Sequence, residues 1–75
     1  MISMENAILE MHQNLTDGLF IAFVTADDEQ YYSLTKSDDV QFLDSKTVFI
    51  KRKSGRNSII NLNLIIEIEI RRGLF

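Results

Sequence analysis

The sequence predicts a mostly β domain with one N-terminal α-helix, in which a bent five-stranded antiparallel sheet closes into a small barrel. Apolar residues recur at helical spacing only near the N-terminus, and from Leu19 onward they alternate at strand spacing. Clusters of turn-forming residues divide this second part into short segments. A chain of 75 residues is near the lower size limit of an independent folding unit, so residues 1–75 are expected to form a single domain.

The helix is predicted over about residues 3–14. Its apolar face consists of residues three or four positions apart, namely Met4, Ala7, Ile8, Met11 and Leu15. Ser3 is the expected N-cap, because its hydroxyl can accept a hydrogen bond from an amide of the first turn. Gly18 is expected to end the segment, since glycine tolerates a left-handed backbone. A helix this short needs a partner surface in water, so its apolar face is expected to pack on the sheet.

The barrel is predicted over about residues 19–72. Its strands are expected at residues 19–25, 31–43 and 47–53 and in two parts of 58–72, and the second strand bends at "KSDD", residues 36–39. "SGRN" after the third strand is a hairpin turn signal. A sheet of this size removes its free edges by curling, which is the reason for expecting a barrel.

The stretch 58–72, "SIINLNLIIEIEIRR", places aliphatic residues at two-residue spacing: Ile60, Leu62, Leu64, Ile66, Ile68 and Ile70. At about 3.3 Å per residue it is too long for one strand of a small domain. We expect a break at Asn61 to Asn63, because asparagine tolerates turn conformations better than its β-branched neighbours. The even-numbered residues are then expected to fill the barrel, which leaves Ile59 and Ile65 beside an exposed backbone edge.

The composition points to self-association. No cysteine is present and His12 is the only imidazole, so no disulfide, metal or other cofactor is predicted. A single core of this size supplies only about 3–5 kcal/mol of stability. Oligomerisation is the remaining source, and the chain is therefore expected to be a homo-oligomer, either a ring or a dimer.

Charge and motifs narrow the class of protein. Eight Lys and Arg stand against eleven Asp and Glu, a mildly acidic balance that disfavours a general nucleic-acid binder but leaves room for a local basic patch. No secretory signal or membrane span is recognised, so we expect a cytoplasmic protein with no membrane contact. No catalytic constellation assembles and no small-molecule substrate is inferred, so the chain is expected not to be an enzyme.

The hairpin around "KRKSGR" is the candidate binding site. It carries Phe49, Lys51, Arg52, Lys53 and Arg56. Strand alternation puts Phe49 on the same face as Lys51 and Lys53, which makes an aromatic platform beside cations, as in proteins that bind single-stranded RNA. The competing interpretation is a solvated hairpin tip whose charges keep a sheet edge soluble.

The order of elements resembles the Sm-like fold, including the bacterial Hfq-like proteins. The matching segments are "MENAILEMHQN", "YYSLTKSDDVQFL", "TVFIKRK" and "SIINLNLIIEIEI", the last standing for a fourth strand, a short turn and a fifth strand. The resemblance implies a ring closed by pairing the fourth strand of one subunit with the fifth strand of its neighbour. The Lys-His pair that Hfq-like proteins use for uridine contacts has no counterpart in "INLNLI", and SH3-like barrels of other functions share the pattern.

Two functions follow from these patterns. The first is a non-enzymatic Sm-like barrel that self-associates through its C-terminal strands and binds single-stranded RNA weakly. The expected interface residues are Ile59, Asn61, Ile65, Glu67 and Glu69. The alternative is a protein-interaction or accessory module that uses an exposed strand edge or the helix face and binds no nucleic acid.

Overall fold

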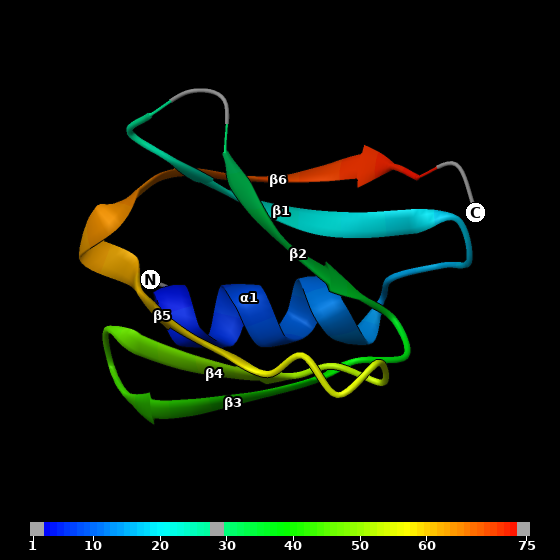
Figure 1. Cartoon of the computed structure of the whole chain (residues 1–75), viewed down its shortest axis with the longest axis horizontal. Coiled ribbons are helices and arrows are strands. Elements are labelled where there is room, and N and C mark those ends of the chain that lie inside the picture. The colour runs from blue at the N-terminus through cyan, green and yellow to red at the C-terminus, as the bar shows by residue number, and fades with distance from the viewer. Residues whose placement is uncertain (1–2, 28–29, 74–75) are drawn as a thin grey trace.

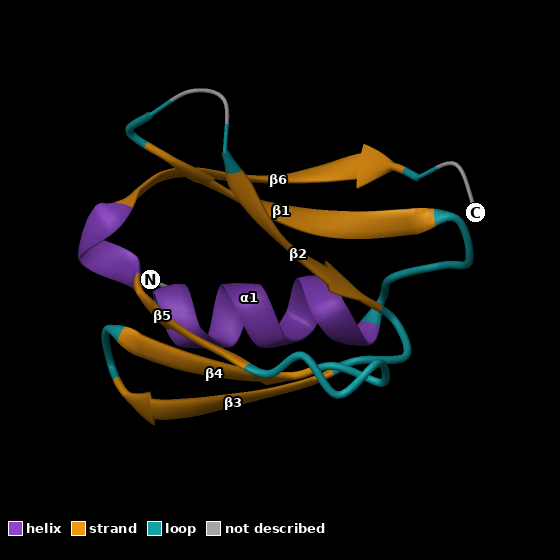
Figure 2. Cartoon of the chain, viewed as in Figure 1, coloured by secondary structure: helices purple, strands orange, loops and turns teal. Residues whose placement is uncertain are grey.

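The computed structural model describes residues 3–27 and 30–73, and it confirms a mostly β chain with an N-terminal helix (Figure 1, Figure 2). The elements are α1 (Met4–Gln13), β1 (Leu19–Thr25), β2 (Tyr31–Thr35), β3 (Asp39–Asp44), β4 (Thr47–Lys51), β5 (Ser58–Asn61), the 3-10 helix η1 (Leu62–Leu64) and β6 (Ile65–Arg72). Within the described ranges no helix has the length and apolar character needed to cross a membrane.

Helix α1 begins at the predicted cap. The Asn6 amide donates to Oγ of Ser3 at 3.1 Å, which satisfies one of the free N–H groups of the first turn. The helix ends at Gln13 and is capped by Asn14, so Gly18 is not its stop. Gly18, with φ of 86°, instead lies in the turn that leads into β1, where the Leu19 amide donates to the Thr16 carbonyl.

The strands form two antiparallel sheets, in the orders β2-β1-β6 and β3-β4-β5. The prediction of five strands in one bent sheet is therefore wrong: residues 3–27 and 30–73 contain six strands in two three-stranded sheets. The predicted second strand is divided because the chain turns sharply at residues 36–38. There the Asp38 amide donates to the Thr35 carbonyl, and the Asp38 carboxylate accepts the Thr35 amide. As a result β2 pairs with β1, whereas β3 pairs with β4.

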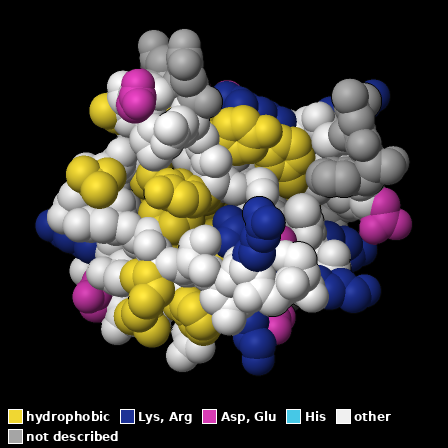
Figure 3. Space-filling view, in the orientation of Figure 1, with side chains coloured by type: hydrophobic (Ala, Val, Ile, Leu, Met, Phe, Trp, Pro, Cys, Tyr) yellow, Lys and Arg dark blue, Asp and Glu magenta, His cyan; other side chains and the backbone are white. Residues whose placement is uncertain are grey.

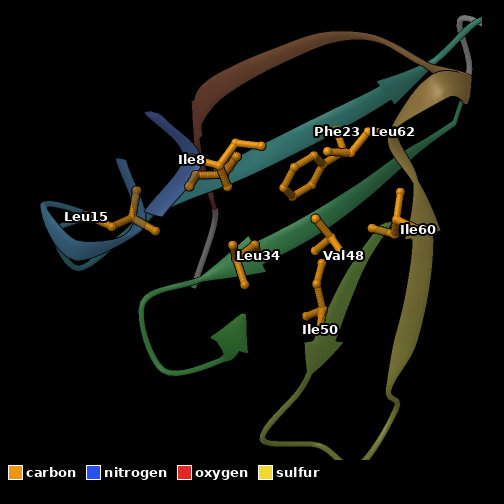
Figure 4. Packing of buried hydrophobic residues seen from close by; sticks show 9 residues of the cluster. Ile8, Leu15, Phe23, Leu34, Val48, Ile50, Ile60 and Leu62 are labelled. Atoms are coloured by element: carbon orange, nitrogen blue, oxygen red, sulfur yellow. The ribbon is translucent and has the colours of Figure 1, made fainter. Parts of the chain in front are cut away.

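The core lies between the two sheets and the helix (Figure 4). Its fully or nearly buried members are Ile8, Leu15, Ile21, Phe23, Leu34, Val48, Ile50, Ile60 and Leu62, which come from α1, the segment after it, both sheets and η1. The Phe23 ring on the central strand β1 has no exposed surface. One continuous apolar cluster thus holds both sheets and the helix together.

The break predicted in the last stretch is confirmed. Leu62–Leu64 form η1 between β5 and β6. The Asn61 side chain accepts a hydrogen bond from the Asn63 amide at 2.9 Å, and the Leu62 amide donates to the Lys46 carbonyl at 2.8 Å. These contacts replace the strand ladder for one helical turn and separate the two strands.

The expectation that all even-numbered residues of this stretch fill the interior is wrong. Ile60 and Leu62 are buried, but Leu64, Ile66 and Ile70 are 66%, 62% and 48% exposed, and Ile65 packs on the core instead. The 3-10 turn and a register shift in the pairing of β1 with β6 between Val24 and Thr25 interrupt the two-residue alternation. A bulge of this kind changes which side chains face inward.

Candidate nucleic-acid interface and open strand edges

The turn between β4 and β5 carries the predicted basic cluster. Gly55 has φ of 90°, and its amide donates to the Arg52 carbonyl at 2.9 Å. The Arg52 amide in turn donates to Oδ1 of Asn57 at 3.2 Å. These local hydrogen bonds fix the path of the turn, as the Ser-Gly-Arg-Asn sequence predicts.

The structure divides the basic cluster between two sides of the hairpin. Phe49 and Lys51 lie on the outer face of the β3-β4-β5 sheet, where they line a shallow hollow of about 440 Å³ with Asp39 and Gln41. Phe49 is half-buried and Lys51 is exposed, and Lys51 is the cross-strand partner of Asp39. An aromatic ring beside a cation is therefore present here, as predicted, but the cation has a carboxylate as its neighbour on the sheet.

Arg52 points away from this face. Its Nη1 donates to the Arg56 carbonyl at 3.0 Å and to Oγ of Ser58 at 2.6 Å, and its Nη2 donates to the Ser33 carbonyl at 2.9 Å. Ser33 lies in β2 of the other sheet, so Arg52 connects the two sheets. The structure thus places Arg52 apart from Phe49 and Lys51, as expected for a residue directly after Lys51, because successive side chains of a strand point to opposite faces.

Lys53 and Arg56 are exposed on the turn, but of these two only Lys53 lines a groove beside Arg52. That groove has a volume of about 590 Å³ and lies between the turn at residues 16–18, the bend at 36–38 and the hairpin turn. Lys36 also lines it. The sequence interpretation missed Lys36 and residues 16–18, although "KSDD" was identified as a bend, because nothing in the sequence indicates that these three segments meet.

Asp38 ties the bend to the hairpin from inside this groove. It is 7% exposed, and its two carboxylate oxygens accept the amides of Thr35 at 3.0 Å and Lys53 at 3.1 Å. Burial alone would raise its pKa, but these hydrogen bonds and the charge of Arg52 outweigh burial and hold the pKa of Asp38 below its ordinary value. The carboxylate is therefore ionised at neutral pH and acts as a structural link.

Strand β6 presents the predicted self-association edge. It ends the β2-β1-β6 sheet, and its outer edge has no ladder partner among residues 3–27 and 30–73. Ile66 and Ile70 are exposed along it. Each lines a hollow between β6 and α1: Ile66 lies beside Met4, and Ile70 lies beside Met11.

The outer face of β6 is polar and partly satisfied within the chain. Glu69 forms an ion pair with Arg71, whose guanidinium lies 4.9 Å from the centre of the Tyr31 ring. The Tyr31 ring stacks on Phe20 at 5.8 Å between centroids. Glu67 is exposed, so it is the more available of the two glutamates predicted at the interface.

Strand β5 presents a second open edge, at the end of the β3-β4-β5 sheet. Ile59 is 66% exposed there and lies opposite Phe49 across the ladder. Asn61 is exposed at the end of the strand but is occupied as the cap of η1, and Ile65 is half-buried against the core. Of the five predicted interface residues, Ile59 and Glu67 are thus the most accessible to a neighbour.

Comparison of the chain with protein-family models, with curated proteins and with solved structures gives no match. The evidence for function is therefore the placement of side chains on this fold. That evidence comprises two open strand edges with exposed isoleucines, an aromatic and basic hollow at Phe49, and a separate polar groove beside Arg52.

Proposed function

We propose that this chain is a non-enzymatic, Sm-like small barrel that self-associates by pairing the β5 edge of one copy with the β6 edge of the next. The two sheets, packed over one core, would be the halves of the barrel. The order of helix, strands, 3-10 turn and last strand supports the resemblance to Sm-like proteins. A contact between two different edges of identical chains forms a ring when its rotation closes.

The observation that carries this proposal is the position of the exposed isoleucines. Large aliphatic side chains at the open ends of sheets are unfavourable in a monomer, which usually blunts such edges with charge, proline or a covering segment. Here Ile59 stands beside one open edge, whereas Ile66 and Ile70 stand beside the other. Pairing the two edges would satisfy backbone N–H and C=O groups and cover these side chains together.

The hollows that flank β6 supply room for such a contact. The hollow at Ile70 has a volume of about 360 Å³, and its walls include Met11 and Leu19. The hollow at Ile66 has a volume of about 190 Å³ and includes Met4. An aliphatic side chain next to the β5 edge of a neighbour, such as Ile59, matches their apolar lining.

Light scattering after gel filtration tests the proposal. The wild-type chain is expected to elute as a closed oligomer, and Ile66→Lys as a folded monomer by circular dichroism. Leu43→Lys is the matched control, because Leu43 is also exposed but lies on β3 and belongs to neither proposed edge. A wild-type monomer at high concentration would reject self-association and favour the alternative, in which the edge receives an extended segment of another protein.

The second part of the proposal is weak binding of single-stranded RNA at the Phe49 hollow. The specific observation is that half-buried Phe49 lies beside exposed Lys51, with Lys53 on the adjoining turn. Bases stack on aromatic rings regardless of sequence, and lysines attract the phosphates. The binding is expected to weaken with salt.

Fluorescence anisotropy with a labelled oligouridylate tests this part. The double variant Lys51→Glu, Lys53→Glu is expected to lose binding, and Phe49→Leu to weaken it while preserving the sheet. Arg72→Glu provides a control for general charge, because Arg72 is exposed at the far end of β6. Full affinity in the double variant would show that the hairpin is only a solvated tip.

A further inference from the structure

The groove beside Arg52 has features that neither proposed activity explains. It has a volume of about 590 Å³ and draws its walls from three segments far apart in the chain. We propose that it is an anion site that binds a phosphate group. The cations Arg52, Lys36 and Lys53 would supply its charge, and the hydroxyls of Thr16, Ser37 and Ser54 would supply hydrogen bonds.

Arg52 is a fixed cation in this groove, and although its charge acts on Asp38, its nitrogens make no ion pair among the described residues. Its side-chain hydrogen bonds all go to neutral acceptors, two backbone carbonyls and the Ser58 hydroxyl. No carboxylate of the described residues lies within 4.0 Å of its nitrogens. A guanidinium that is half-buried and already immobilised loses little entropy when an anion arrives, which favours phosphate as a directly bound counter-charge.

The two carboxylates of the groove do not cancel this charge. Asp38 has both oxygens engaged by the amides of Thr35 and Lys53, so it shapes the wall without offering an oxygen to the ligand. Asp17 is exposed on the opposite turn. Three cations thus face two anions in a chain whose formal net charge is −3, which makes the groove locally positive.

The distribution of cations on the surface agrees with this placement. On the face in Figure 3, most Lys and Arg side chains lie toward the centre and right, over the region where the hairpin turn and the bend between β2 and β3 meet in Figure 1. Hydrophobic side chains gather mainly on the other half. Lys36 and Lys53 have flexible side chains that can close over a ligand held by Arg52, as lysines do around phosphates.

The test is a titration with inorganic phosphate at constant ionic strength, followed by the backbone amide signals in NMR. Saturable shifts are expected at Lys36, Ser37 and Ser54. Lys36→Gln should weaken binding about two- to fivefold and Asp17→Asn should strengthen it by a similar factor, as for single exposed charge contacts. Lys46→Gln, at an exposed lysine on another turn, should have no effect.

Shifts that spread over all lysines, rise linearly with phosphate concentration and are unchanged in Asp17→Asn would overturn the proposal and indicate only an adventitious ion.

Two further measurements identify the source of the phosphate. If an oligouridylate displaces phosphate more strongly than uridine monophosphate does, the group belongs to an RNA backbone, and the reverse order indicates a small phosphorylated metabolite. Lys51→Glu separates this site from the Phe49 hollow, because it should weaken RNA binding there and leave phosphate binding intact.

Discussion

Arg52, one residue beyond β4, donates a hydrogen bond from Nη2 to the carbonyl oxygen of Ser33 in β2, 2.9 Å away. Because the β2-β1-β6 and β3-β4-β5 sheets share no ladder among the described residues, this contact is a polar link between them. The same guanidinium also holds the start of β5 through Ser58. One side chain thus fixes the hairpin turn and its position against the opposite sheet.

Arg52→Ala should therefore destabilise the fold. It removes three hydrogen bonds and leaves the half-buried Ser33 carbonyl without this donor, and the expected loss in the free energy of unfolding is about 1.5–3 kcal/mol. Urea unfolding measures it. The control is Arg56→Ala at an exposed side chain, where a change within about 0.5 kcal/mol is expected. Equal stability of both variants would show that the Arg52 contacts are not maintained in solution.

Asp38 predicts a specific pH dependence. Its pKa is lowered in the folded state, so the unfolded chain binds more protons in the acid range and stability falls as pH decreases through and below the ordinary aspartate value of 3.8. Asp38→Asn removes this titration while keeping one acceptor for an amide. The variant should be less stable than wild type at pH 7 but lose less stability between pH 5 and about pH 2.5. Urea unfolding at pH 5 and at about pH 2.5 measures the two losses. An equal loss of stability in wild type and in Asp38→Asn would show that Asp38 does not cause the acid sensitivity.

Ile68 and Ile66 provide a matched pair on one strand. Ile68 lies opposite Phe23 and packs on the core, whereas Ile66 is exposed at the bulge. Ile68→Lys should cost about 2–4 kcal/mol, most of the stability of a domain this small. Circular dichroism at low protein concentration should show Ile68→Lys largely unfolded and Ile66→Lys folded. Unfolding of both variants would mean that β6 adopts the register expected from simple alternation, in which both isoleucines face the interior.

Gly55 tests the geometry of the hairpin turn. Its φ of 90° is unfavourable for side chains, yet a Cβ atom there would meet nothing within 4 Å. Gly55→Ala should therefore cost about 1 kcal/mol through backbone strain alone, and Gly55→Asn should cost less, because asparagine tolerates this region better. Thermal unfolding of the two variants measures the difference. Identical melting temperatures for wild type and Gly55→Ala would indicate a different turn.

The elements that local chemistry determines could be predicted from the sequence. Ser3 caps α1, and the asparagines at 61 and 63 mark the break between β5 and β6. In both cases one short-range hydrogen bond decides the structure, and its donor and acceptor are three or two positions apart. The number of strands could not be predicted in the same way. The residues at 36–38 suit a bend within one strand as well as a turn between two strands, so the sequence does not distinguish the two.

The orientation of side chains was harder to predict. Val24 and Thr25 of β1 pair with Glu67 and Ile65, so Ile66 is the extra residue of a bulge in β6, and nothing in the unbroken alternation of this stretch marks that position. The role of Arg52 could not be predicted, because one of its acceptors, the Ser33 carbonyl, is 19 positions away. The two binding proposals differ in the same respect. The proposed RNA site depends on strand alternation and could be predicted from the sequence, whereas the proposed phosphate site depends on segments that meet only in the folded chain.

The pairing of Leu19 with Arg72 has a consequence for how the chain folds. The β3-β4-β5 sheet consists of consecutive hairpins and can form early, whereas β1 waits for the last strand before its second side is covered. Such distant pairing slows folding, since a long loop must close first. During synthesis, Phe23 and Ile21 therefore remain without their β6 partners until residues 68 and 70 have been made, and this interval is when a nascent chain most needs protection by a chaperone.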